Sequence, residues 1–239
     1  EKWEKASSLM NKGNEAMTQQ KLATAKEAYK QAIPLLKELN ESSQNLQKTA
    51  KEAKSTCEKR HELVHKGVSA FHPERAQEID SLFEKGKKKW QNTKLADAKE
   101  NFQSCLELLP EQPLKLKANG ILVDYKHALK WLVHLENVGN ATKRTWYKAY
   151  SWVQNLQYAD TSKWRMPTRD ELQNLHKLLA ETEQQQLSSK EQLNRKCWSS
   201  TETSDSIGNV YVIDLQNGET TVEGKDANHY LIPTYSSSD

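Results

Sequence analysis

Apolar residues recur at helical spacing through the first half of the chain. Residues 9–38 align with residues 82–111 without a gap, at a constant offset of 73, and twelve of the thirty positions are identical. In each copy a first apolar pattern with a spacing of four residues is followed by a short turn, and a second helical pattern begins at Leu22 or Leu95. Self-similarity at a fixed offset predicts a duplicated helical hairpin.

The small residues of each copy carry a further pattern. Gly13 or Gly86 is followed after twelve residues by alanine, four later by Tyr29 or Phe102, and three later by another small residue. This order resembles the tetratricopeptide repeat, and each glycine is expected to allow close helix–helix approach. The resemblance implies a concave protein-docking surface. The alternative is a helical stalk that spaces or dimerises the second half.

The linking segment also has helical character. Pro34 lies inside the second helix of the first copy and is expected to kink or shorten it. Residues 41–70 contain no glycine or proline before Gly67, so they predict one long helix, with Pro73 close to its end or opening the next helix.

Three cysteines and one histidine pair are candidates for chemistry. The cysteines are odd in number and far apart, so they indicate neither a disulfide framework nor a zinc site. Cys105 occupies a small packing position and is expected in the core, whereas Cys57 could be exposed. His61 and His65 share a helical face and could bind a metal with a third ligand. Because no third ligand stands out, a packed or solvated pair is favoured and no metal is expected.

From residue 118 onward the period changes. Short alternating segments surround two helical ones, which predicts an α+β domain with one antiparallel sheet over residues 118–239, after a helical domain over residues 1–117. Asn217-Gly218 predicts a two-residue hairpin turn, and residues 182–195 are polar and predict a mobile loop. Strands are expected within residues 121–135, 196–202, 209–224 and 229–235, and helices within residues 145–156 and 167–181.

Charge and hydropathy narrow the classes of function. The chain has 35 basic and 32 acidic residues, a net charge of +3, which gives no dense basic stripe and argues against nucleic acid as a partner. No apolar run is long enough to cross a membrane. The chain starts at Glu1 without a methionine, which is compatible with removal of a signal peptide or of a longer N-terminal part.

The second half carries a family resemblance. The segments TWYKAYSW, WRMPTRDEL and WSST follow one another in that order and precede the Asn-Gly hairpin and an aromatic final strand. Over residues 118–235 this pattern resembles the Lcl C-terminal domain family, which is named for the end of a bacterial collagen-like adhesin. The resemblance implies a C-type-lectin-like fold. Family members often pair a cysteine of the last strand with one of the first helix; both are missing here, so no disulfide is expected.

WRMPTRDEL invites a structural and a catalytic interpretation. Structurally, Trp164 anchors a sheet–helix junction, Arg165 pairs with a carboxylate or with backbone carbonyls, and Thr168 with Glu171 forms a capping box. This interpretation is favoured, because it gives every residue of the segment except Met166 and Arg169 a structural role.

Catalysis in this domain would need a nucleophile such as Cys197 or Ser199 and a base such as His176 or His229. No glycine-bounded nucleophile turn is present. The formylglycine-generating enzymes, which share the fold, use a cysteine pair, whereas this domain has only Cys197. The chain is therefore expected not to be an enzyme, and no catalytic residue and no cofactor are expected.

The resemblance implies a bacterial binding protein of the periplasm, cell surface or extracellular space. Its lectin-like domain would recognise a glycan or a protein, and its helices would present that domain or dock partners. Ligands of such folds meet loops, which makes Glu202, Asp205 and Asn209 the candidate ligand-binding residues. The alternative is a scaffold or regulatory subunit of an envelope assembly that uses both domains for protein contacts. No calcium–sugar triplet is present.

Overall fold

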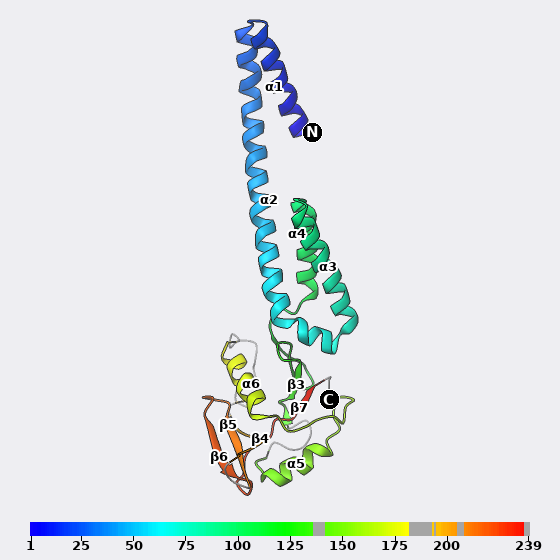
Figure 1. Cartoon of the computed structure of the whole chain (residues 1–239), viewed down its shortest axis with the longest axis vertical. Coiled ribbons are helices and arrows are strands. Elements are labelled where there is room, and N and C mark those ends of the chain that lie inside the picture. The colour runs from blue at the N-terminus through cyan, green and yellow to red at the C-terminus, as the bar shows by residue number, and fades with distance from the viewer. Residues whose placement is uncertain (136–141, 182–192, 194, 205–207, 237–239) are drawn as a thin grey trace. The chain divides into compact units, whose positions relative to one another are not determined.

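The chain folds into helices followed by an α+β region, as Figure 1 shows by element order. The computed structural model describes residues 1–135, 142–181, 193, 195–204 and 208–236. Two compact units result, one from Glu1–Glu58 with Ser81–Cys105 and one from Lys59–Asp80 with Leu106–Asp239. The α+β class expected from the sequence is confirmed, while a domain boundary at residues 117 and 118 stays a prediction.

Four helices form the first part of the chain. They are α1 (Lys2–Thr18), α2 (Leu22–Phe71), α3 (Pro73–Gln91) and α4 (Leu95–Leu108). The long helix expected over residues 41–70 is confirmed, and α3 begins at the expected proline. The prediction that Pro34 kinks or shortens its helix is wrong as to the shortening, because α2 runs through Pro34 within one helix of 50 residues; a kink there stays a prediction. Pro34 is exposed, so water can satisfy the carbonyl group that lacks a backbone partner.

The two helical hairpins repeat each other in detail. A Cβ atom on Gly13 would lie 2.5 Å from the Tyr29 ring, and one on Gly86 would lie 2.8 Å from the Phe102 ring. Gln20 and Thr93, which close the two turns, both have φ near 57°. The predicted duplication and the close helix approach at the glycines are therefore confirmed. The tetratricopeptide identity of the repeat stays a prediction.

The α+β region contains two antiparallel sheets where one was expected. The first has the order β1 (Leu114–Leu116), β2 (Ile121–Asp124), β3 (Leu129–Leu132) and β7 (Thr234–Ser236). The second has the order β4 (Lys196–Glu202), β5 (Asn209–Asp214) and β6 (Thr220–Gly224). Two helices, α5 (Trp146–Gln154) and α6 (Arg169–Glu181), lie between β3 and β4 in sequence.

Two strand details differ from the sequence-based prediction. The β5–β6 turn is longer than two residues: Asp214 and Glu219 close it, and Gly218 donates to the Asp214 carbonyl at 2.7 Å. The Asp214 carboxylate also accepts the Gln216 N–H at 2.9 Å, so a side-chain turn replaces the tight hairpin. The final strand is shorter than residues 229–235, because only Thr234–Ser236 pair continuously with β3. The expected loop at residues 182–195 lies mostly outside the described residues.

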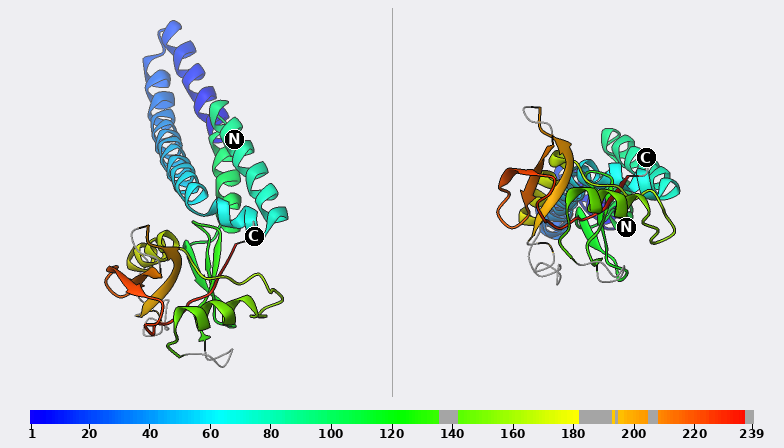
Figure 2. Two further views of the ribbon diagram at one scale, coloured as in Figure 1. Left: turned by 60° about the horizontal axis from the view of Figure 1, so that its bottom comes forward. Right: turned by 90° about the horizontal axis from the view of Figure 1, so that it is seen from below.

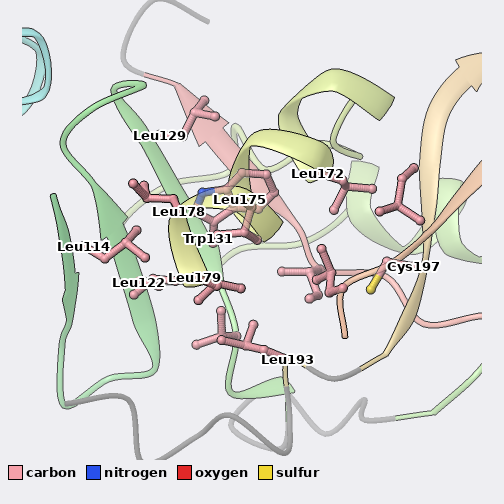
Figure 3. Packing of buried hydrophobic residues seen from close by; sticks show 14 residues of the cluster. Leu114, Leu122, Leu129, Trp131, Leu172, Leu175, Leu178, Leu179, Leu193 and Cys197 are labelled. Atoms are coloured by element: carbon pink, nitrogen blue, oxygen red, sulfur yellow. The ribbon is translucent and has the colours of Figure 1, made fainter. Parts of the chain in front are cut away.

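One apolar core joins both sheets to α6. Leu172, Leu175, Leu178 and Leu179 on α6 are buried in a cluster that includes Trp131 of β3 and Ile213 of β5. Leu175 and Leu178 lie beside Trp131 in Figure 3. Figures 1 and 2 show α6 alongside the β4–β5–β6 sheet. The helix expected within residues 167–181 is therefore the element that both sheets share.

The WRMPTRDEL segment holds α6 in that place, and its structural interpretation is confirmed. Arg165 donates two hydrogen bonds to the Glu171 carboxylate, at 2.9 and 2.8 Å. Glu171 accepts the Thr168 N–H at 2.8 Å while Thr168 Oγ1 accepts the Glu171 N–H at 3.2 Å, which is the predicted capping box. Arg165 also exchanges backbone hydrogen bonds with Thr234 of β7, and Pro167 accepts one from Ser200 of β4.

Replacing Gly86 with alanine tests the close approach in the second hairpin. Glycine to alanine in a helix ordinarily stabilises by up to about 1 kcal/mol. Here the added methyl group would meet the Phe102 ring, so we expect a loss of about 1–3 kcal/mol, measured by chemical denaturation. In a Phe102→Leu background the penalty should shrink, because the smaller side chain relieves the contact. A stabilising Gly86→Ala substitution in the unaltered chain would show that the helices are not in contact there.

Replacing Glu171 with glutamine tests the capping network. Burial raises the pKa of Glu171, but hydrogen bonds from Arg165 and Thr168 outweigh it and the net pKa is lowered. Because the pKa of Glu171 is lower in the folded than in the unfolded state, its carboxylate stabilises the folded state at pH values above about 4, the unfolded carboxyl pKa. This contribution is lost as the pH falls through the folded-state pKa. We expect Glu171→Gln to cost about 1–3 kcal/mol at neutral pH and progressively less in acid. The control is Asp170→Asn, which removes an exposed pair with Arg169 and should change stability little; equal effects would contradict the assignment.

Candidate ligand-binding surface on helix α5

Two of the three expected ligand residues lie at one end of the β4–β5–β6 sheet. Glu202 ends β4 and Asn209 begins β5, and the Thr203 N–H donates to the Asn209 carbonyl at 3.1 Å. Asp205 lies outside the described residues. The structure therefore brings Glu202 and Asn209 to the same sheet end, as expected for residues that flank one loop.

Lys225 connects this sheet end to α5. Its Nζ donates to Glu202 Oε1 at 2.8 Å and lies 4.4 Å from the centre of the Trp146 ring. Only 11% of the Lys225 side chain is exposed, so the ammonium group is held between a carboxylate and an aromatic face. The Lys225 carbonyl also accepts the Trp146 N–H, at the first turn of α5. Glu202 thus has a structural partner.

An aromatic cluster covers the start of α5. Trp146 is buried and donates its indole N–H to the Ser199 carbonyl at 2.9 Å. Tyr150 stacks on it with ring centres 5.1 Å apart, and Tyr147 meets it edge-on at 5.5 Å. Tyr147 and Tyr150 remain 58% and 44% exposed. Two tyrosines are therefore presented to solvent on a base fixed by a buried tryptophan.

A groove of about 890 Å³ runs along the same helix. Its lining includes Tyr147, Lys148, Ser151 and Trp152 of α5, then Asn155 and residues 156–158. A smaller hollow of about 400 Å³ continues over residues 157–162. Aromatic and polar side chains both line this surface, a mixture that suits ligands with both apolar and hydrogen-bonding parts.

The far end of the groove is held by a tight turn. Tyr158 pairs with Thr161 through two backbone hydrogen bonds, and Ala159 and Asp160 between them have positive φ angles. The Tyr158 hydroxyl donates to the Asn119 carbonyl at 2.5 Å, and Trp164 Nε1 donates to the Tyr158 carbonyl at 3.0 Å. These bonds fix the end of the groove before any ligand binds, which lowers the entropic cost of binding.

The candidate nucleophiles and bases make other contacts. Ser199 is buried and donates to the Tyr211 carbonyl at 2.8 Å. His176 Nδ1 lies 3.0 Å from the Leu215 carbonyl, and His229 Nε2 lies 2.7 Å from Glu223 Oε2. Burial raises the pKa of the Cys197 thiol to about 12. Cys197 is therefore protonated at neutral pH and poorly suited to attack a substrate.

The sequence-based reasoning missed the α5 surface. Helical spacing groups Tyr150 with Trp146, Ala149 and Val153 on one face and does not single out Tyr147. Tyr147 and Tyr150 lie outside the buried face of α5. Placing the residues of this helix on a 3.6-residue period could have shown this.

The expectation that Cys57 could be exposed is wrong: Cys57, like Cys105, is buried.

A second cluster missed from the sequence lies on α2 and α3. Asp80 Oδ1 is 3.2 Å from His61 Nε2 and 2.8 Å from His65 Nε2. Asp80 therefore supplies a third candidate ligand atom beside the histidine pair, which did not stand out from the sequence. Asp80 follows His65 by fifteen positions, beyond the turn at Pro73, so only the folded hairpin brings it close.

The C-terminal region is thus an α+β domain with a solvent-facing groove along α5. Residues 120–234 match the family model of the Lcl C-terminal domain, which confirms the resemblance for the second half of the chain. The comparison with curated proteins found no match. Among the described residues, no helix is both long and apolar enough to span a membrane.

The cysteines provide a direct test of the buried thiol. All three cysteine thiols are buried. We expect a thiol reagent such as Ellman's reagent to label none of them quickly in the native chain, and to label all three after denaturation. The rates are read from the absorbance of the released thiolate. Fast native labelling that is lost in Cys197→Ser would contradict the assignment and return Cys197 to consideration as a nucleophile.

Proposed function

We propose that the protein is a non-enzymatic bacterial binding protein, located in the periplasm, at the cell surface or outside the cell, whose C-terminal domain binds a glycan along α5. The observation that carries the proposal is the exposed Tyr147, which lines the groove together with polar side chains of α5; Tyr150 is also exposed on the same helix. The match to the Lcl C-terminal domain supports a binding role of this kind.

The chemistry of the groove suits a sugar ring. A pyranose has apolar C–H faces, which favour contact with an aromatic ring, and hydroxyl edges that need hydrogen-bonding partners. Tyr147 and Trp152 supply aromatic surface, while Lys148, Ser151 and Asn155 supply donors and acceptors along one side of α5. Glu202 and Asn209 are further candidate contacts, at the sheet end that Lys225 connects to α5.

The helical part would present the domain or dock a protein. Its exposed apolar residues favour the second candidate function, a scaffold or regulatory subunit that makes protein contacts with both parts. Large apolar side chains stand exposed at Trp3, Met17, Leu22 and Ile33. Exposed apolar surface of this kind favours partner association when the side chains form one patch.

The first test is a glycan-array screen with the full chain, with and without calcium, followed by titration of each hit. We expect saturable binding to one class of glycan. Tyr147→Ala should weaken it by about tenfold, which corresponds to about 1.4 kcal/mol. Asn155→Ala should weaken it as well, because the sugar loses a hydrogen-bonding partner.

The matched control is Trp3→Ala, which removes an exposed aromatic residue from the helical part and should leave glycan affinity unchanged. A blank array from folded protein would overturn glycan recognition. Cross-linking and pull-down with the full chain, compared with Trp3→Ala, would then test the scaffold alternative.

A further inference from the structure

Two imidazoles and one carboxylate meet across the α2–α3 hairpin. His61 and His65 lie one turn apart on α2, and Asp80 lies on α3. The ligand atoms of the three side chains all lie within 4.8 Å of one another. All three residues belong to one compact unit, in which residues 59–80 form a continuous segment around the turn.

The imidazole rings are already arranged as a pair. Their centroids lie 4.2 Å apart with an angle of 21° between the planes. The side chains of His61 and His65 are 21% and 24% exposed, so the pair is largely sheltered while Asp80 remains open to solvent. Packing of α2 against α3 has therefore oriented both rings before any ion arrives.

His65 has an unusual contact. Its Nε2 is buried and lies 2.8 Å from Asp80 Oδ1, yet it makes no hydrogen bond to that oxygen or to another described group. A close nitrogen–oxygen approach without hydrogen-bond alignment leaves the imidazole nitrogen without the partner that a buried polar atom normally has. A metal ion shared by both atoms would satisfy it.

The distances suit a small tetrahedral ion. Zinc binds imidazole nitrogen and carboxylate oxygen at about 2.0–2.2 Å, so neighbouring ligand atoms lie about 3.3 Å apart. The two nitrogen–oxygen distances, 3.2 and 2.8 Å, are near that edge length. Small side-chain rotations would lengthen the shorter distance, between His65 Nε2 and Asp80 Oδ1, to this value.

The sequence gives an independent signal. His61-Glu62-Leu63-Val64-His65 has the form H-E-x-x-H, in which two histidines on one helical face bind zinc. The motif alone is short and occurs by chance. Here it lies on a helix, and a third ligand reaches it from the next helix, which is the structural context that the motif requires.

We propose that His61, His65 and Asp80 form a binding site for a divalent transition-metal ion of the zinc type, with the remaining coordination position open to solvent. The nitrogen-rich ligand set favours zinc, nickel, cobalt or copper over magnesium and calcium, which prefer oxygen ligands. The ion links α2 to α3 and so stabilises the hairpin, because it binds the folded arrangement only.

The test uses the full chain without an affinity tag, treated with chelator and dialysed. Zinc chloride is titrated by calorimetry, and cobalt chloride is titrated by visible absorption, where tetrahedral cobalt with nitrogen ligands gives a strong band. We expect one ion per chain, and a rise in the thermal midpoint on adding zinc. His61→Gln, His65→Gln and Asp80→Asn should each weaken binding by about tenfold or more and abolish the cobalt band.

His127→Gln is the matched control. His127 Nδ1 lies 2.7 Å from Asp124 Oδ2, so this is also a histidine–aspartate pair, but no third ligand accompanies it in the part of the chain that the structure describes. Its removal should leave metal binding unchanged. Circular dichroism of each variant checks that the helices persist. The proposal is overturned if the chain binds no ion at one-to-one stoichiometry, or if binding survives unchanged in all three site variants.

Discussion

The Arg165–Glu171 ion pair is the interaction on which the arrangement of the C-terminal region depends. Glu171 is shared between the Arg165 guanidinium and the Thr168 N–H, so one carboxylate both starts α6 and fixes the segment before it. That segment bonds through its backbone to β7 on one side and to β4 on the other. The two sheets therefore meet at one short stretch of chain, and the leucines of α6 fill the space between them.

The same segment also reaches the proposed ligand surface. Trp164, next to Arg165, donates its indole N–H to the Tyr158 carbonyl at the end of the groove. Trp146 and Trp198 likewise direct their indole N–H groups to backbone carbonyls, of Ser199 and Arg144. Trp146 and Trp198 thus connect α5 and the residues before it to β4, and Trp164 connects the WRMPTRDEL segment to the turn at Tyr158. The tyrosines are left at the surface, where ring and hydroxyl are both available to a ligand.

Elements whose structure depends on residues close together in the sequence could be predicted from sequence patterns. The capping box at Thr168 and Glu171 was predictable because both residues lie within one helical turn. The duplicated hairpin was predictable because Gly13 and Gly86 recur with their aromatic partners at a fixed offset. Two local predictions were wrong. Pro34 does not end its helix, because it is exposed to solvent. Asn217-Gly218 does not form a two-residue turn, because the Asp214 side chain accepts a hydrogen bond from Gln216 in a longer turn. Two other contacts join residues that are distant in sequence and could not be predicted from local patterns. Asp80 approaches His65 only in the folded α2–α3 hairpin, and Lys225 pairs with Glu202, 23 residues away.

Backbone contacts anchor the proposed metal-binding hairpin to the sheet that follows it. The Gly67 N–H donates to the Tyr125 carbonyl at 2.8 Å, and a Cβ atom at Gly67 would lie 2.4 Å from Tyr125 Cα and from that carbonyl oxygen. Only glycine permits this approach, which lies half a turn from His65 on α2. Lys130 of β3 also places its ammonium group 4.6 Å from the centre of the Phe71 ring, at the end of the same helix. An ion that fixes α3 to α2 at His65 would therefore stiffen a helix end that already packs on β2 and β3. The Gly67 contact would thus couple the proposed metal site to the first sheet.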